Sequence, residues 1–247
     1  MTEYAGYVII WLDVCGSKIG APNLGEDSMN VFDIIGPIMI GPSSSHTAGA
    51  VRLGQIARKI LGEDVVQARI ELSGSFARTY RGHGTDKALL AGIMGLCPDD
   101  TRIRCSPQLA QEKGISFSFL ETELPDAHPN TARIHLTGER GKTTTIVGTS
   151  TGGGNILVTE IDGLKVTFTA QCNTLLVVHW DRPGTIAAVS NYTATSGINI
   201  GNFQLSRTRK GGKAIMMLEI DGEVPDAIMD HLRAFDNLID IILIRVG

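Results

Sequence analysis

The chain has 247 residues, of which 43% are hydrophobic and 19% are charged, which is typical of a globular protein and excludes disordered, collagen-like and coiled-coil classes. Its net charge of -4 and pI near 5.9 exclude the basic surface that nucleic-acid binding requires. At roughly 150 residues per domain, the length allows one large domain or two smaller ones.

Residues 1–28 differ from the rest of the chain. They contain a short apolar run, Tyr7 to Leu12, followed by the turn-rich residues Gly20 to Gly25. The run is far shorter than the ~20 residues that span a bilayer, and Glu3 stands where a signal peptide carries Lys or Arg. A second methionine, Met29, precedes the first strongly patterned segment. We therefore expect a disordered extension over 1–28 and a cytoplasmic protein without a membrane partner.

A serine-rich segment, Gly41-Pro42-Ser43-Ser44-Ser45-His46-Thr47, precedes the first predicted helix. Apolar residues then recur at helical spacing up to Gly62, which ends the helix: Ala50, Leu53, Ala57, Ile60 and Leu61. The serines are thus predicted to lie at a helix N-terminus, where free N–H groups and the helix dipole favour a carboxylate or phosphate. His46 could move a proton there near neutral pH. The alternative is an ordinary serine cap beside an exposed histidine.

A second candidate locus follows a predicted strand at residues 65–72. The sequence Arg81-Gly82-His83-Gly84-Thr85-Asp86 is predicted to form a loop that opens a helix ending near Leu96. Glycines on both sides of His83 would let a ligand approach the backbone closely, and Asp86 and Lys87 add charge. The alternative is a histidine that serves only as a turn residue.

Three further strands are predicted at residues 115–120, 132–136 and 143–147, with His128-Pro129-Asn130 before the second. Gly152-Gly153-Gly154 and a hairpin at Asp162-Gly163 complete this region.

From Thr174 the pattern becomes one complete unit. Strands are predicted at 175–180, 198–206, 213–220 and 239–246, and helices at 184–195 and 225–235. This βαββαβ order is that of a ferredoxin-like domain. We therefore predict an α/β (α+β) protein with a mixed-sheet domain at 29–171, a boundary near 171–174 and a second domain at 174–247.

The four cysteines are dispersed, without a C-x-x-C pair or a histidine at zinc-ligand spacing. We expect buried reduced thiols and no metal site in this chain. The residues are Cys15, Cys97, Cys105 and Cys172.

Several motifs together resemble the iron-sulfur-dependent L-serine dehydratases, most closely the β chain of the two-subunit form. They are Phe32-Asp33-Ile34-Ile35-Gly36-Pro37, Gly41 to Gly49, Gly74-Ser75-Phe76, Gly82-His83-Gly84-Thr85-Asp86, His128-Pro129-Asn130-Thr131 and Ser150-x-Gly152-Gly153-Gly154. Asp181-Arg182-Pro183-Gly184-Thr185-Ile186 and Ile198-Asn199-Ile200 are similar to the ACT domains that close such chains.

This resemblance implies an L-serine ammonia-lyase, which converts L-serine to pyruvate and ammonia through aminoacrylate. It implies a [4Fe-4S] cluster that acts as Lewis acid and is held by an α chain, so that this subunit is inactive alone. His46 and His83 become the candidate catalytic groups, with the roles of acid and base left open. The implied substrate-binding residues are Ser43, Ser44, Ser45, Thr47, Gly84, Thr85, Asp86 and Asn130.

An alternative of another class is a non-catalytic regulatory module. The first domain also resembles the allosteric serine-binding domain of some phosphoglycerate dehydrogenases, and ACT domains bind small effectors between paired copies. By that analogy the chain would sense amino acids and form a homodimer through its ACT domain. A cysteine-bearing α-chain partner would favour the enzyme.

Overall fold

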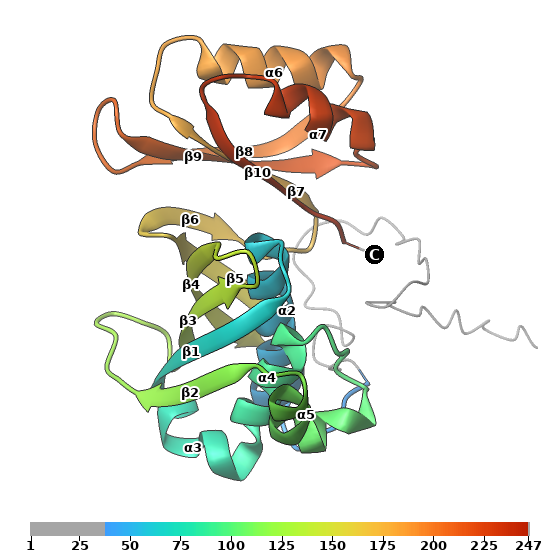
Figure 1. The fold of residues 1–247 in the computed structure, drawn as a ribbon, viewed down its shortest axis with the longest axis vertical. Helices are drawn as coiled ribbons and strands as arrows, with labels where there is room; N and C mark the ends of the chain where they lie inside the picture. The colour runs from blue at the N-terminus through green and yellow to red at the C-terminus, as the bar shows by residue number, and fades with distance from the viewer. Residues whose placement is uncertain (1–37, 247) are drawn as a thin grey trace, which may run out of the picture.

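The computed structural model describes residues 38–246, a mixed α/β structure with two separate sheets (Figure 1). This confirms the predicted fold class. The extension expected at residues 1–28 and the motif at residues 32–37 lie outside the described residues. No helix within the described range is long and apolar enough to cross a membrane.

The first sheet has six strands in the order β2-β1-β3-β4-β5-β6. β1 and β2 run parallel, and the other neighbouring pairs are antiparallel. Strand alternation buries Ala68, Ile70 and Leu72 of β1 in the core and places Arg69 on the opposite face. The strands are β1 (Val65–Gly74), β2 (Ser116–Glu121), β3 (Asn130–Gly138), β4 (Thr143–Gly152), β5 (Asn155–Ile161) and β6 (Leu164–Phe168).

Two helices, α2 (Ala50–Leu61) and α4 (Thr85–Ile93), pack directly on each other. A Cβ at Gly92 would overlap the Val51 carbonyl, so glycine lets the two backbones touch. The packing places the first turn of α4 beside the π-helical turn η1 (Ser45–Gly49) that precedes α2. The two candidate loci are thereby brought together.

Three helical segments were not predicted: α3 (Ser75–His83), η2 (Thr101–Cys105) and α5 (Ser106–Glu112). The prediction of a loop at Gly82-His83-Gly84 is therefore wrong, because His83 is the last residue of α3 and Gly84, at φ 73°, ends that helix. The start of α3 depends on a distant group, since the amides of Ser75 and Phe76 donate to the Pro129 carbonyl at 2.6 and 3.2 Å. Local sequence carries no sign of such a partner.

The second sheet confirms the predicted βαββαβ unit. Its four strands lie in the order β10-β7-β9-β8, with antiparallel neighbours, and its two helices cover one face (Figure 1). The elements are β7 (Asn173–Trp180), α6 (Thr185–Thr195), β8 (Asn199–Arg207), β9 (Lys213–Asp221), α7 (Asp226–Arg233) and β10 (Leu238–Ile244). The predicted boundary falls in the link between β6 and β7, and independent folding of each half stays a prediction.

The two faces of this second sheet have different partners. On β9, Met216 and Leu218 pack in the cluster beneath α6 and α7, whereas Ile215 and Met217 join the core cluster of the first domain. The sheet thus lies between its own helices and the first domain (Figure 1). The continuous apolar run of β9 follows from burial on both faces.

Side chains also connect the two domains. The Gln204 amide of β8 pairs with Thr167 of β6 in both directions, accepting from the Thr167 N–H and donating to its carbonyl at 3.1 Å each. Lys142 and Asp240 form an ion pair at 2.6 Å. The domains therefore share apolar and polar contacts.

The expectation of buried thiols is wrong for two cysteines. Cys105 and Cys172 are free and exposed. Cys105 ends the short helix η2, where its Sγ donates to the Arg102 carbonyl at 3.3 Å, and Cys172 lies in the link before β7. Both positions are at the ends of elements and not on their apolar faces.

Candidate active site

The serine-rich segment begins a helix, as predicted. Ser43, Ser44 and Ser45 are half-buried, and the chain then forms the π-helical turn η1, in which the Gly49 amide donates to the Ser44 carbonyl at 2.9 Å. Ser43 Oγ accepts a hydrogen bond from the backbone amide of His46 at 3.3 Å, which is a side-chain cap of the first turn. Short π-helical turns occur frequently at functional sites.

Close packing fixes this turn against the first sheet. A Cβ at Gly41 would overlap the Thr47 side chain, and a Cβ at Gly49 would overlap Ser150 Oγ. Ser150 lies near the end of β4 and is fully buried. The Ser150–Gly154 motif is therefore held beside the serine-rich segment, although about 100 residues separate the two along the chain.

Asn130 lies at the edge of the same group. It begins β3, and its Nδ2 donates to the Ser150 carbonyl at 3.4 Å. The backbone amide of Asn130 donates to Nδ1 of His128 at 3.1 Å. The structure thus connects the His128–Thr131 and Ser150–Gly154 motifs through Asn130.

His46 is the buried centre of the site, with 8% of its surface exposed. Its Nδ1 lies 3.2 Å from Ser43 Oγ, and its Nε2 lies 3.1 Å from Thr79 Oγ1 and 3.4 Å from Ser75 Oγ. Both ring nitrogens therefore face hydroxyl groups, a type of group that can donate or accept a hydrogen bond.

His83 packs against His46, with ring centroids 4.7 Å apart and ring planes at 90°. Burial lowers the pKa of His46, and the neighbouring His83 lowers it further. A lowered pKa keeps His46 neutral at pH 7, which is the state that a general base requires.

A cavity of about 320 Å³ joins the two candidate loci. Thr47 lines it from the serine-rich segment, and His83 and Gly84 line it from the α3–α4 junction, while His46 contacts the His83 ring without lining the cavity itself. Cationic side chains also line the cavity and suit a ligand that carries a carboxylate: Arg81, Lys87 and Arg104.

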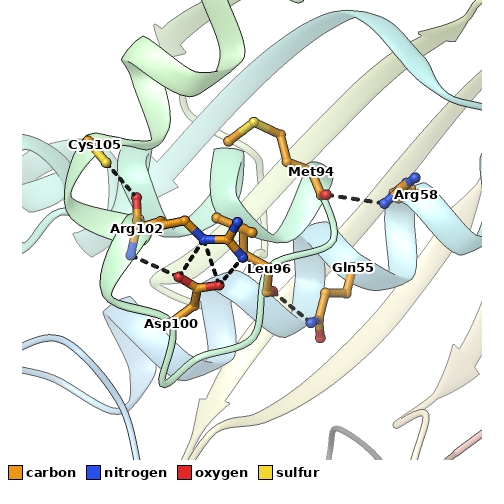
Figure 2. Close-up of polar contacts among 7 residues, drawn as sticks. All are labelled: Gln55, Arg58, Met94, Leu96, Asp100, Arg102 and Cys105. Atoms are coloured by element: carbon orange, nitrogen blue, oxygen red, sulfur yellow. Dashed lines mark hydrogen bonds and ion pairs between the residues drawn. The ribbon is translucent and has the colours of Figure 1, made fainter. Parts of the chain in front are cut away.

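The segment that carries Arg104 to the cavity is braced by a local network (Figure 2). Asp100 accepts from Arg102 through both carboxylate oxygens, with the shortest contact at 2.6 Å. This hydrogen bonding by Arg102 lowers the pKa of the Asp100 carboxyl. Gln55 of α2 donates to the Leu96 carbonyl at 2.8 Å, which ties the start of the segment to α2.

Of the predicted site residues, Thr47, His83 and Gly84 line the cavity, and the others do not: Ser43, Ser44, Ser45, His46, Thr85, Asp86 and Asn130. Thr85 is fully buried, and its Oγ1 has no hydrogen-bond partner within residues 38–246. The buried Oδ1 of Asp86 has no partner in that part of the chain either. Neither residue lines the cavity, so the structure does not group them with Thr47, His83 and Gly84.

Sequence reasoning missed Thr79 and Arg104 altogether, and it named Ser75, Ser150 and Arg81 only as members of longer motifs, without a role in the site. Thr79 lies four residues after Ser75 and four before His83, which places all three on one face of a helix. That signal becomes visible only once residues 75–83 are known to be helical.

Comparisons with known proteins show which family the chain belongs to. Residues 30–113 match the family "Serine dehydratase beta chain". The chain is 42% identical to the probable L-serine dehydratase β chain of Bacillus subtilis, over 86% of this chain and 96% of the relative, and 36% identical to the L-serine dehydratase β chain of Peptoniphilus asaccharolyticus, over 81% and 90%.

A third relative has a different name. The D-3-phosphoglycerate dehydrogenase of Bacillus subtilis is 29% identical over 79% of this chain but only 37% of its own length. The two β chains, by contrast, are matched over nearly their whole length at higher identity. The chain therefore belongs to the L-serine dehydratase β-chain family.

Proposed function

We propose that this chain is the β subunit of an L-serine ammonia-lyase and that, with an α chain, it converts L-serine to pyruvate and ammonia. The observation that carries the proposal is the pair of histidines, 4.7 Å apart, between a serine-rich helix start and a cation-lined cavity. This arrangement offers a carboxylate site next to a proton-transfer site.

The first helical turn and the cations supply the binding site for the serine carboxylate. Backbone amides at a helix N-terminus carry partial positive charge, and Ser44, Ser45 and Thr47 add hydroxyl donors, while Ser43 caps the turn and contacts His46. Arg81 adds a full positive charge at the cavity wall. A carboxylate held here presents Cα toward the histidine pair.

The histidine pair supplies acid and base. Two imidazoles this close disfavour double protonation, and burial further favours the neutral form of His46. We assign the neutral role to His46, because its pKa is lowered, and this ring takes the Cα proton. His83, which lines the cavity, returns a proton to the leaving hydroxyl as water departs. The aminoacrylate that remains tautomerises to an imine, and its hydrolysis gives pyruvate and ammonia.

The iron-sulfur cluster that the resemblance implies does not fit the residues that the structure describes. Residues 38–246 contain no group of three or more His, Cys, Asp or Glu side chains placed to hold a metal ion. Of the cysteines in that range, Cys97 and Cys105 lie in the first domain and Cys172 lies in the link to the second. We therefore assign the cluster to the α chain.

A second candidate function is a non-catalytic amino-acid-binding module that pairs through its C-terminal domain. The match to a D-3-phosphoglycerate dehydrogenase over 79% of this chain favours it, because related sequence occurs in a protein with a different name. Such a module would use the same helix start to bind an amino-acid carboxylate without turnover.

The deciding experiment is an anaerobic assay of pyruvate formation from L-serine by this chain alone and after co-purification with an L-serine dehydratase α chain. We expect the pair to be active and the isolated chain to be colourless and inactive. Pyruvate formation by the isolated chain, together with iron-sulfur absorption, would refute the assignment of the cluster to the α chain. Serine binding by calorimetry without turnover in the pair would favour the regulatory module.

A further inference from the structure

The hydroxyl of Thr79 has only one proton, and it donates this proton to the Ser75 carbonyl. Thr79 Oγ1 lies 2.7 Å from the Ser75 carbonyl, four residues earlier in α3. A carbonyl oxygen can only accept, so Thr79 must be the donor in this contact. Toward His46 Nε2, at 3.1 Å, Thr79 Oγ1 is therefore left as an acceptor.

Because Thr79 Oγ1 can only accept from the ring, its position selects one tautomer of the neutral His46 ring. Since Thr79 accepts, Nε2 must carry the hydrogen, and Nδ1 must carry the lone pair. The contacts on the other side of the ring agree: Ser43 Oγ accepts from the His46 amide at 3.3 Å, which leaves its own proton to donate to Nδ1 at 3.2 Å.

The other hydroxyl near Nε2 does not make this choice. Ser75 Oγ lies 3.4 Å from Nε2 and can rotate to donate or to accept. Ser43 can likewise reverse its role toward Nδ1. Thr79 differs from both because a main-chain carbonyl fixes its proton.

We infer that Thr79 is a positioning residue that fixes the Nε2–H tautomer of His46, so that the basic Nδ1 faces Ser43 and the start of the serine-rich helix. The inference deepens the proposed function, on which its catalytic meaning rests. A base on that side of the ring meets a substrate whose carboxylate is held by the same helix start. In the opposite tautomer, the basic nitrogen would face α3 and the proton would face Ser43.

The test is a two-bond ¹H–¹⁵N correlation spectrum of the full chain with ¹⁵N-labelled histidine, recorded without any α chain. His46→Gln identifies the His46 signals among those of the six histidines. We expect the neutral ring of the wild-type protein to show a protonated Nε2 and a bare Nδ1. A protonated Nδ1 in the wild-type chain would overturn the inference whatever the variants do.

Three variants separate positioning from packing. Thr79→Val keeps the shape but removes the oxygen, and we expect mixed tautomers, whereas Thr79→Ser restores the hydroxyl and the single tautomer. Thr193→Val in α6 is the matched control, because Thr193 Oγ1 also bonds a helix carbonyl, Ser190 O at 2.8 Å, far from His46. An unchanged tautomer in Thr79→Val would overturn the inference.

In the assembled enzyme, Thr79→Val should lower kcat by about 10- to 100-fold with little change in KM, and Thr79→Ser should recover most of the rate. The two proposals can fail separately. A chain with the expected tautomer but no serine turnover in the presence of an α chain refutes the proposed function alone. Turnover that is equal in wild type and Thr79→Val refutes the role of Thr79 alone.

Discussion

His46 in the first domain and His179 in the second are both buried histidines, with 8% and 1% of their surfaces exposed. The nitrogens of His46 face hydroxyl groups at a cavity edge. In β7, His179 Nδ1 lies 2.8 Å from the Trp180 carbonyl, to which it donates, and no hydrogen-bond partner of its buried Nε2 is found among residues 38–246. A buried histidine is therefore a candidate catalytic group when its neighbours can exchange a proton, and burial alone does not make it one.

The largest effect is expected from His46→Gln, with His179→Gln as its counterpart in the second domain. In the assembled enzyme, His46→Gln should lower kcat at least ~10²-fold, because a positioned base is lost. His179→Gln should leave the rate within a few fold and affect only stability. Pyruvate formation and thermal unfolding are measured for both variants. An equal loss of rate in the two would contradict the catalytic role of His46.

The pH dependence sharpens the same contrast. The folded-state pKa of His46 lies below the value near 6.5 of an unfolded chain, so the unfolded state binds more protons in acid. The stability contribution of neutral His46 is present above pH ~6.5 and is lost as the pH falls through the folded-state pKa. Denaturant unfolding between pH 5 and 8 should show this loss in the wild type and a flatter profile in His46→Gln.

The exposed partner of His46 should matter for rate only. His83→Ala is expected to lower kcat by about 10²-fold, because His83 lines the cavity beside His46. Since His83 is exposed, the unfolding midpoint should change little. A sharp fall in the midpoint with an unchanged rate would show that His83 is structural.

The smallest effects are expected in the second domain, where matched changes test its two faces. Ile215→Val and Ile220→Val should each cost about 0.5–1.5 kcal/mol in unfolding free energy and leave the rate unchanged. Only Ile215 joins the core of the first domain, so only its variant should speed hydrogen exchange in α2. Faster exchange there in both variants would mean that the faces are not distinct.

The sequence predicted the elements whose signals are local. The βαββαβ unit, the helix stop at Gly62 and the turn at Asp162-Gly163, where φ is 49° and 80°, all follow from periodicity and turn chemistry. Helix α3 was missed because Phe76 and Tyr80 are its only buried residues and its start depends on the Pro129 carbonyl.

The candidate site was predicted only in part for the same reason. The serine-rich segment and both histidines are visible as motifs, and the structure places them together. His46 was expected in a serine-rich loop and not on an apolar face, but it packs edge-on against Phe76, with ring centroids 5.2 Å apart. The contacts of His46 with Thr79 depend on tertiary packing that no local pattern records.

The reciprocal bonds between Gln204 and Thr167 have a consequence for solubility. β6 is the last strand of the six-stranded sheet, and an uncovered edge strand invites another chain to add to it. Gln204 occupies both main-chain groups of Thr167, as a neighbouring strand would, with a single side chain. The Gln204 amide thus blocks the addition of another strand at Thr167. It can do so only while the second domain stays in contact with β6.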